Sequence, residues 1–244
     1  LYSQPSNAYW RVDLFIALGI LYRDTMSDQI LEQLFESAAK VRLLKLFLRN
    51  QRSKFTAREA RERAQIDVRT AENALERLRK AGVLKSYARK ISPDAPVKKR
   101  TTVKDGREKN TVNIAKTEKT YFINPGFIFF DELRGLVLKS SPASKSRIVK
   151  RIKGLGRIKL LILSGIFMRP DRELSRTDLL IVGDDVSEKR FVNFMKQLEA
   201  EAGCEIQYSL LTSDEFAYRR KMLDRFLRDV IERPNEVLVN KLGV

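Results

Sequence analysis

The chain contains one cysteine and no histidine among its 244 residues, and each scarcity excludes a class of site. Cys204 alone cannot build a disulfide framework, and a Cys/His zinc site within one chain is excluded for the same reason. The commonest general base in enzymes, histidine, is also missing. These features are compatible with a reducing compartment, so we expect a cytoplasmic protein with no metal and no other cofactor.

A long apolar run is lacking as well. The run at residues 12–22 (VDLFIALGILY) is shorter than the roughly 20 residues that a membrane-spanning helix needs, and Asp13 interrupts it. We therefore expect no membrane partner. Residues 1–29 are assigned to an N-terminal extension, which could be an extra helix or a weak signal-like segment. We favour a mis-assigned start, with Met26 as the alternative initiator, or a poorly specified extension.

Positive charge is what the chain has in excess. It contains 48 Lys and Arg against 31 Asp and Glu, a net charge of +17. Residues 1–144 hold 28 basic and 16 acidic side chains, a net +12, whereas residues 145–244 hold 20 and 15, a net +5. The first half is therefore the stronger candidate for a surface that binds a polyanion. The length and the 43% hydrophobic content allow two domains, each with its own core.

Residues 56–82 (TAREARERAQIDVRTAENALERLRKAG) predict two short helices joined by a tight turn. Thr56 and Glu59 have the spacing of a capping box, so the first helix should begin there. Asp67 follows Ile66 in the turn and can cap the second helix, which Gly82 should end. The apolar positions of the second helix recur every three or four residues and should face the core: Val68, Ala71, Leu75 and Leu78.

The opposite face of this second helix is polar and basic. It carries Arg69, Thr70, Asn73, Arg77 and Lys80. Arginine and asparagine are the side chains best suited to bidentate contacts with guanine and adenine in the major groove. An ordinary amphipathic helix with a solvated basic face fits the same pattern. The capped helix, short turn, second helix and basic hairpin together favour DNA binding, with Thr56 and Arg58 as further contacts.

A basic hairpin should follow the second helix. Residues 84–90 and 120–124 predict its strands, and Asp105-Gly106 is a turn signal at its tip. From Lys85 to Lys119 there are 11 basic and 4 acidic residues. The expected DNA contacts in this run are Lys98, Lys99, Arg100, Lys104, Arg107 and Lys109. A disordered polar loop is the alternative, and the two are compatible because such a tip can become ordered only on DNA.

An amphipathic helix is predicted at residues 30–48. Its apolar face contains Leu31, Leu34, Phe35, Ala38, Val41, Leu44 and Leu48, and it is broad enough, with Leu43, Leu46 and Phe47, to be a dimer seam. Residues 125–138 return to an apolar helix. Together these elements have the layout of a winged helix-turn-helix domain over residues 30–139.

The second half predicts an α/β domain over residues 153–244, joined by a linker at residues 140–152 that begins with SSPASKS. Strands are expected at residues 157–163, 177–182, 205–211 and 236–240, and helices at residues 187–202 and 213–233. The apolar face of the last helix contains Phe216, Leu223, Phe226, Leu227 and Val230. The fold class of the whole chain is then α+β.

The runs LILSGIF and SRTDLLIVGD resemble the start of the minimal nucleotidyltransferase fold, over roughly residues 155–240. In that family a Gly-Ser pair ends the first strand, and an Asp-x-Asp pair on the second strand holds magnesium with a third carboxylate from the third strand. In this chain Ser164 and Gly165 lie near the Gly-Ser position, shifted by one place. Arg176 replaces the first aspartate and Asp178 keeps the second, while the third strand offers only Glu205 at its start. A cation at position 176 would repel magnesium, so the resemblance implies a catalytically degenerate domain.

The chain as a whole resembles winged-helix transcription regulators of the ArsR/MarR kind fused to a nucleotidyltransferase-like domain. This implies a non-enzymatic regulator that binds double-stranded DNA as a homodimer, with a second domain for sensing, dimerisation or a nucleotide or protein ligand. One alternative is an active nucleotidyltransferase that uses the first domain to hold nucleic acid. Asp171, Glu173 or Asp184 would then have to supply the second metal ligand. Another alternative is an antitoxin or a protein-interaction module.

Overall fold

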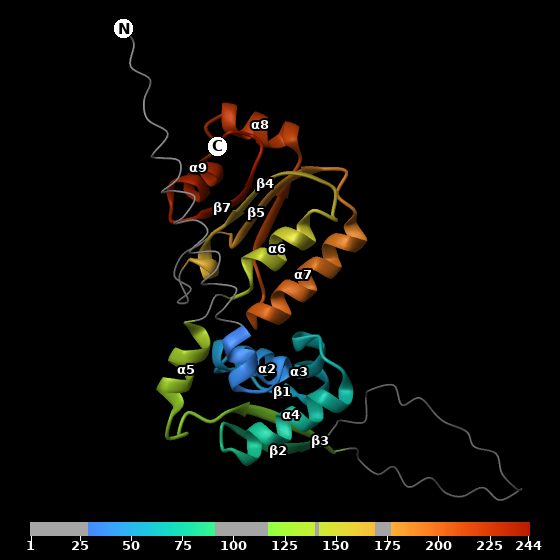
Figure 1. Ribbon diagram of the computed structural model, residues 1–244, viewed down its shortest axis with the longest axis vertical. Helices are drawn as coiled ribbons and strands as arrows, with labels where there is room; N and C mark the ends of the chain where they lie inside the picture. The colour runs from blue at the N-terminus through green and yellow to red at the C-terminus, as the bar shows by residue number, and fades with distance from the viewer. Residues whose placement is uncertain (1–28, 91–116, 140–141, 169–176) are drawn as a thin grey trace, which may run out of the picture.

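The computed structural model describes residues 29–90, 117–139, 142–168 and 177–244, and it has a mixed α+β architecture with one sheet of three strands and one of four (Figure 1). The proposed extension, including Met26, lies outside the described residues except for its last position. Within the described part of the chain, no helix combines the length and the apolar character needed to cross a membrane.

The first unit, at the bottom of Figure 1, is built on an antiparallel sheet of strand order β1-β3-β2. Its elements are α2 (Ala38–Arg49), β1 (Phe55–Thr56), α3 (Ala57–Ala64), α4 (Val68–Lys80), β2 (Leu84–Lys90), β3 (Thr117–Ile123) and α5 (Phe130–Leu138). One apolar cluster joins α2, α3, α4, α5 and the sheet, with Phe47, Leu75 and Leu84 fully buried. Strand β2 has the bounds predicted from the sequence, and β3 begins three residues earlier than expected.

The prediction of one continuous helix at residues 30–48 is wrong, because the structure has two helical segments there. Residues 29–34 are helical, the backbone turns at Glu36 with φ +52°, and α2 then begins at Ala38. The cause is Ser37, whose side chain accepts a hydrogen bond from the Lys40 N–H (3.3 Å) and so caps a new helix. Because of this break, Leu34 does not face the core as expected, and its side chain is 61% exposed.

The second unit is a four-stranded sheet of order β6-β5-β4-β7 with helices on both faces. Its elements are α6 (Lys145–Ile152), β4 (Arg157–Leu163), the 3-10 turn η1 (Gly165–Phe167), β5 (Leu179–Asp184), α7 (Glu188–Ala202), β6 (Tyr208–Leu211), α8 (Ser213–Lys221), α9 (Arg225–Glu232) and β7 (Glu236–Asn240). Strand β4 is antiparallel to β5 and β7, whereas β6 runs parallel to β5. The two central strands are apolar on both faces: Leu161 and Ile181 face α6 and α7, whereas Leu160 and Leu180 face α8 and α9.

Two predictions for the second half need correction. The proposed linker at residues 140–152 is helical from Lys145, because Ile148 and Ile152 form an apolar stripe that is fully buried against the sheet. The predicted helix at residues 213–233 is broken at Leu223, where φ is +51° and Asp224 caps α9 through the Leu227 N–H (3.0 Å). Leu223 is consequently 81% exposed instead of facing the core.

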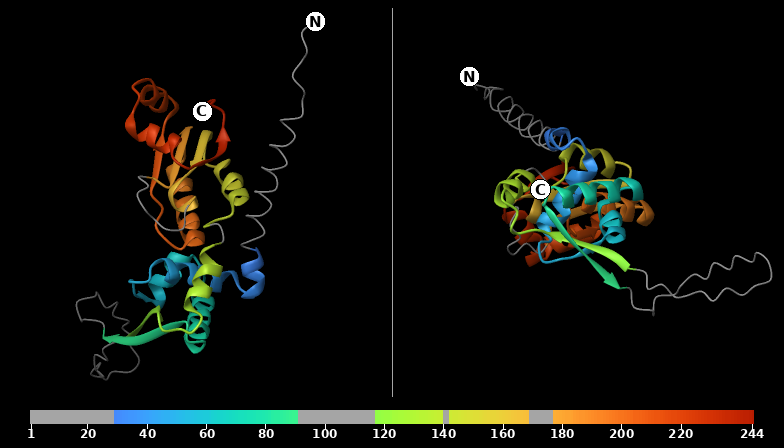
Figure 2. Two further views of the ribbon diagram at one scale, coloured as in Figure 1. Left: turned by 90° about the vertical axis from the view of Figure 1, so that its left-hand side faces the viewer. Right: turned by 90° about the horizontal axis from the view of Figure 1, so that it is seen from below.

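Helix α2 is also where the two units meet (Figures 1 and 2). Asn50 donates from Nδ2 to the Gly203 carbonyl (2.8 Å), and the buried Lys45 donates from Nζ to the Pro142 carbonyl (3.3 Å). Gly203 ends α7 with φ +78° and lies directly on the backbone of α2: a Cβ there would be 2.5 Å from the carbonyl carbon of Lys45. The dimer seam considered for Leu43, Leu46 and Phe47 is therefore filled within one chain.

Replacing Gly203 by alanine should lower the free energy of unfolding by about 2–4 kcal/mol, because the left-handed backbone is strained for alanine and the new methyl group overlaps α2. Denaturant unfolding measures the change. Gly135→Ala is the matched control, since a Cβ on this glycine of α5 meets no atom within 4 Å. It should stabilise the helix by about 0.5–1 kcal/mol. Equal effects of the two substitutions would contradict the close packing at Gly203.

Candidate nucleic-acid interface

The structure confirms both predicted helix caps, one at the start of α3 and one at the start of α4. Thr56 Oγ1 accepts from the Glu59 N–H (3.2 Å), and a Glu59 carboxylate oxygen accepts from the Thr56 N–H (2.8 Å). Asp67 Oδ1 accepts from the Thr70 N–H (2.9 Å), and hydrogen bonds from Thr70 hold the pKa of this carboxyl below its usual range. Between the caps, Gln65 takes a left-handed conformation. The start of α4 is thereby fixed relative to α3.

The end of α4 is equally well defined. Gly82 has φ +81°, its N–H donates to the Arg79 carbonyl (3.0 Å), and the Val83 N–H donates to the Leu78 carbonyl (3.1 Å). This pair of bonds is the Schellman motif, and it confirms Gly82 as the residue that ends the helix. Strand β2 follows two residues later, so the orientation of the hairpin is coupled to that of α4.

The outward face of α4 carries the side chains predicted for base contacts. Arg69, Asn73, Arg77 and Lys80 are exposed, and Thr70 is half-buried. The opposite face packs on the core through Ala71, Ala74, Leu75 and Leu78. Val68 was predicted to face the core, but as the first residue of α4 it projects past the end of the packed interface and is 51% exposed. In Figure 1, α4 and the hairpin lie on the side of the first unit away from the second unit.

Acidic residues at the edge of this face are mostly paired. Glu76 is 2.6 Å from Arg79 and 4.0 Å from Lys119 on β3, and the hydrogen bond from Arg79 lowers the pKa of Glu76. Arg58, predicted as a DNA contact, is exposed but pairs with Glu62 (3.0 Å). The Thr56 hydroxyl is used in the cap of α3. The exposed surface of α4 therefore carries the cations at positions 69, 77 and 80 beside one exposed carboxylate, Glu72.

The expected phosphate contacts of the hairpin tip fall outside the described residues. These are Lys98, Lys99, Arg100, Lys104, Arg107 and Lys109, together with the turn signal Asp105-Gly106. The described base of the hairpin adds residues that the sequence analysis missed. Lys85 and Tyr87 are exposed on one face of β2, and Lys54 Nζ lies 5.2 Å from the centre of the Tyr87 ring. The alternation of side chains along a strand could have placed Lys85 and Tyr87 on this outer face.

In the second unit, Asp178 serves the fold through both of its carboxylate oxygens. Oδ1 accepts from the Ile166 N–H and Oδ2 from the Gln207 N–H, each at 3.0 Å, and the side chain is almost fully buried. The nearby Ser164 donates from Oγ to the Thr177 carbonyl (2.7 Å), and Gly165 begins η1. These bonds tie the end of β4 to β5 and to the chain entering β6. Arg176, and also Asp171 and Glu173, lie outside the described residues.

Asp184 lies at the other end of β5 from Asp178. Its carboxylate accepts from the Ser213 N–H (3.0 Å) and from Ser213 Oγ (2.8 Å), and Lys159 Nζ is 3.0 Å away. The hydrogen bonds from Ser213, with that cation, hold the pKa of Asp184 far below its usual range. Asp184 therefore connects the end of β5 to the start of α8 by hydrogen bonds. Over the described residues, no three acidic, cysteine or histidine side chains gather where they could hold a metal ion.

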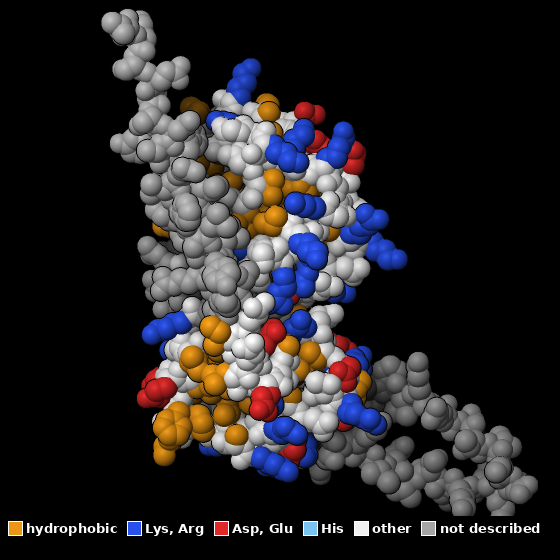
Figure 3. All heavy atoms as spheres, in the orientation of Figure 1, with side chains coloured by type: hydrophobic (Ala, Val, Ile, Leu, Met, Phe, Trp, Pro, Cys, Tyr) orange, Lys and Arg blue, Asp and Glu red, His pale blue; other side chains and the backbone are white. Residues whose placement is uncertain are grey.

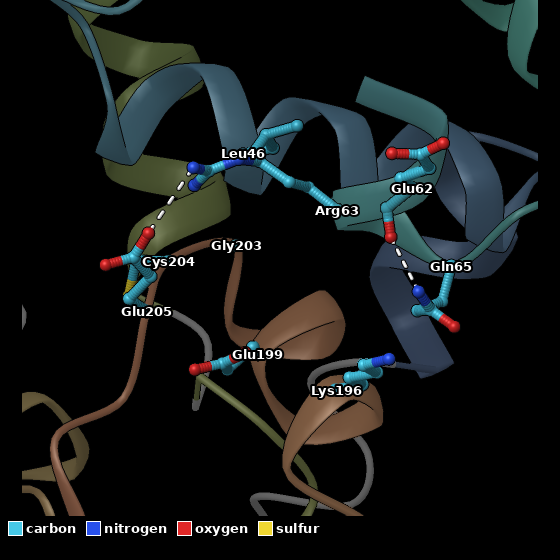
Figure 4. A pocket seen from close by; sticks show the side chains of 9 residues that line it. All are labelled: Leu46, Glu62, Arg63, Gln65, Lys196, Glu199, Gly203, Cys204 and Glu205. Carbon is cyan, nitrogen blue, oxygen red and sulfur yellow. Dashed lines mark hydrogen bonds and ion pairs between the residues drawn. The ribbon is translucent and has the colours of Figure 1, made fainter. Parts of the chain in front are cut away.

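A pocket of about 430 Å³ lies between α3 of the first unit and α7 of the second (Figure 4). Arg63 and Glu205 form an ion pair across it (3.3 Å), and Lys196 and Glu199 line its α7 side. Charges of both signs are therefore present. Glu205, which the resemblance suggested as a third carboxylate, also lines this pocket. It is exposed and pairs with Arg63 rather than lying beside Asp178.

Comparisons of the chain with protein-family models, with curated proteins and with solved structures gave no match.

Replacing Asp178 by asparagine should lower the free energy of unfolding by about 1.5–3 kcal/mol. The asparagine amide has only one acceptor oxygen, so one of the two backbone N–H groups that Asp178 binds would lose its acceptor. Thermal or denaturant unfolding measures this loss. Asp214→Asn is the control: this carboxylate is exposed on α8, and its loss should change stability by no more than about 0.5 kcal/mol. An Asp178→Asn protein as stable as the wild type would contradict the structural role.

Proposed function

We propose that the protein is a cytoplasmic, DNA-binding transcription regulator whose first unit is a winged helix-turn-helix domain. Helix α4 is the recognition helix of this proposal, and the hairpin formed by β2 and β3 is the wing. The observation that carries the proposal is the outward face of α4, where Arg69, Asn73 and Arg77 are exposed on a helix fixed by caps at both ends.

The geometry suits a duplex for two reasons. An α-helix fits the major groove, and a helix fixed at both ends presents its side chains in a defined order to the base edges. The second unit packs on α2 and α3, which leaves α4 and the wing free to approach DNA together. The positive charge of the first 144 residues supplies the attraction to phosphates that positions such a domain.

The second unit is proposed to be non-catalytic and to resemble the nucleotidyltransferase fold only in architecture. The support is the use of Asp178, since both oxygens that would hold a metal ion accept backbone hydrogen bonds instead. The pocket between α3 and α7 is our candidate position for a nucleotide or protein ligand, because such a ligand would contact the helix-turn-helix directly. The alternative is an active nucleotidyltransferase. It would be favoured if the wild type transferred labelled nucleotide in the presence of magnesium or manganese, and if a folded Asp178→Asn variant did not.

Asn73→Ala and Arg69→Ala should each weaken binding to a preferred duplex by about 1–3 kcal/mol and binding to random duplex by less, because base contacts carry the sequence preference. Fluorescence anisotropy with both duplexes measures the difference. Arg228→Ala, at an exposed position of α9 in the second unit, is the control for loss of one cation and should alter neither affinity. Equal losses on both duplexes would show that α4 contacts only the backbone.

Replacing Lys98, Lys99 and Arg100 together by alanine should weaken binding to all duplexes and reduce the salt dependence. The slope of log K against log salt should fall by about 0.9 for each phosphate that the wing no longer neutralises. The matched control replaces three exposed cations of the second unit, Lys221, Arg225 and Arg228, and so changes the net charge equally. The wing assignment fails if the two triple variants have the same slope.

A further inference from the structure

The break between α8 and α9 exposes apolar side chains at one end of the molecule. Leu223 is 81% exposed, and Met222 and Tyr218 are 62% and 65% exposed. The Met222 N–H donates to the Tyr218 carbonyl (3.0 Å), so these two residues lie one helical turn apart on the same side of α8. We call residues 218–228 the α8–α9 tip. In Figure 1, α8 lies at the end of the molecule farthest from the hairpin.

Leu223 ends α8 in the position that glycine usually takes. Its N–H donates to the Arg220 carbonyl (3.2 Å) and the Asp224 N–H to the Arg219 carbonyl (3.0 Å), which together form a Schellman motif. The φ of Leu223 is +51°, a left-handed conformation that is strained for leucine. Its exposed side chain does not compensate for this strain by packing in the core. A large apolar residue kept in a strained, exposed position points to contact with another surface.

Cations surround the apolar side chains of the α8–α9 tip. Arg219 is paired with Glu215 (2.6 Å), and the one carboxylate within the tip, Asp224, caps α9 by accepting from the Leu227 N–H (3.0 Å). At the top of Figure 3, basic side chains lie next to a hydrophobic one, with acidic side chains to the right. The exposed cations of the tip are Arg220, Lys221, Arg225 and Arg228.

This combination of charge and apolar surface fits an anionic lipid bilayer. Lysine and arginine bind anionic headgroups, while neighbouring apolar side chains enter the boundary between the headgroups and the acyl chains. The α8–α9 tip projects from the end of the molecule (Figures 1 and 2), and a bilayer can receive a projecting tip without a cavity of matching shape. A folded acidic protein would need such a cavity, so the tip fits a bilayer better.

We propose that the α8–α9 tip binds the surface of an anionic membrane. Met222 and Leu223 insert among the lipids, and the four exposed cations lie at the headgroup phosphates. The sequence analysis expected no membrane partner because it found no spanning run, but a surface contact needs none. The tip and α4 lie at opposite ends of the molecule, so this contact neither depends on the proposed DNA binding nor competes with it.

The first test is co-sedimentation of the full chain with phosphatidylcholine vesicles, with and without phosphatidylglycerol. Binding should require phosphatidylglycerol, and Leu223→Asp should lower the partition coefficient at least about tenfold, because a leucine side chain is no longer buried in lipid. Leu34→Asp is the matched control: it replaces a leucine of the first unit that is 61% exposed, and it changes the net charge equally. This control should reduce binding far less.

Glycine at position 223 separates the strain from the lipid contact. Leu223→Gly should raise the melting temperature, because glycine adopts the left-handed conformation without strain, and should still weaken vesicle binding. A lower melting temperature would contradict the view that leucine is kept at this position at the expense of stability. The melting temperatures of the aspartate variants verify that they fold.

Insertion is measured with an NBD fluorophore at position 223 of a Leu223→Cys, Cys204→Ser protein, since Cys204 is the one cysteine of the chain. Vesicles with phosphatidylglycerol should shift its emission to the blue. The same label at Val192→Cys, a position of α7 that is 43% exposed, should show no shift.

Three results overturn the proposal. Vesicle binding without a blue shift at position 223 would show that the protein adheres by charge through another surface, such as the basic hairpin. Equal losses from Leu223→Asp and Leu34→Asp would show that the added charge, and not the lipid contact of Leu223, weakens binding. A label that ignores vesicles but shifts with polyglutamate, a model acidic polypeptide, would assign the tip to a protein partner instead.

Discussion

The burial of α2 on all its sides is the constraint on which the rest of the structure depends. A surface helix buries one stripe, yet residues 43–48 of α2 are buried without interruption. One side completes the core of the first unit, and the other meets α7 at Gly203 so closely that two backbones are in contact. The buried Lys45 is tolerated because its amine has the Pro142 carbonyl as a partner. The two units are therefore joined by packing rather than by a tether.

This packing determines what each face of the first unit is able to do. Helices α2 and α3 carry the second unit, so the outward face of α4 and the hairpin are left for a ligand on the opposite side. Helix α3 contacts α4 through the turn at Gln65 and contacts α7 on its other side. A ligand that moved α7 would then act directly on the helix that supports the proposed recognition helix. Under the proposed function, this contact would let the second unit influence DNA binding.

Much of this fold could be predicted from local sequence signals, because caps and strand patterns involve residues close together in the chain. Thr56 with Glu59, Asp67 and Gly82 bound the two helices of the motif as expected, and β2, β4 and β7 have the predicted bounds. The breaks at Glu36 and Leu223 were missed because the apolar spacing continues across them, although the N-cap residues Ser37 and Asp224 mark the start of the next helix. Helix α6 was mistaken for a linker, although Ile148 and Ile152 have helical spacing among the basic residues. The roles of Asp178 and Gly203 depend on groups distant in sequence, so no local pattern reveals them.

Recognition of DNA sequence by the exposed face of α4 is tested most directly by selecting bound duplexes from a random pool. The full-length wild type would be incubated with the pool at a stated, moderate salt concentration, and retained duplexes would be amplified and sequenced over several rounds. If α4 reads base edges, the pool should converge on one short sequence pattern that the wild type binds more tightly than the starting pool. Retained duplexes that stay random in sequence, or no retention even at low salt, would contradict this role of α4.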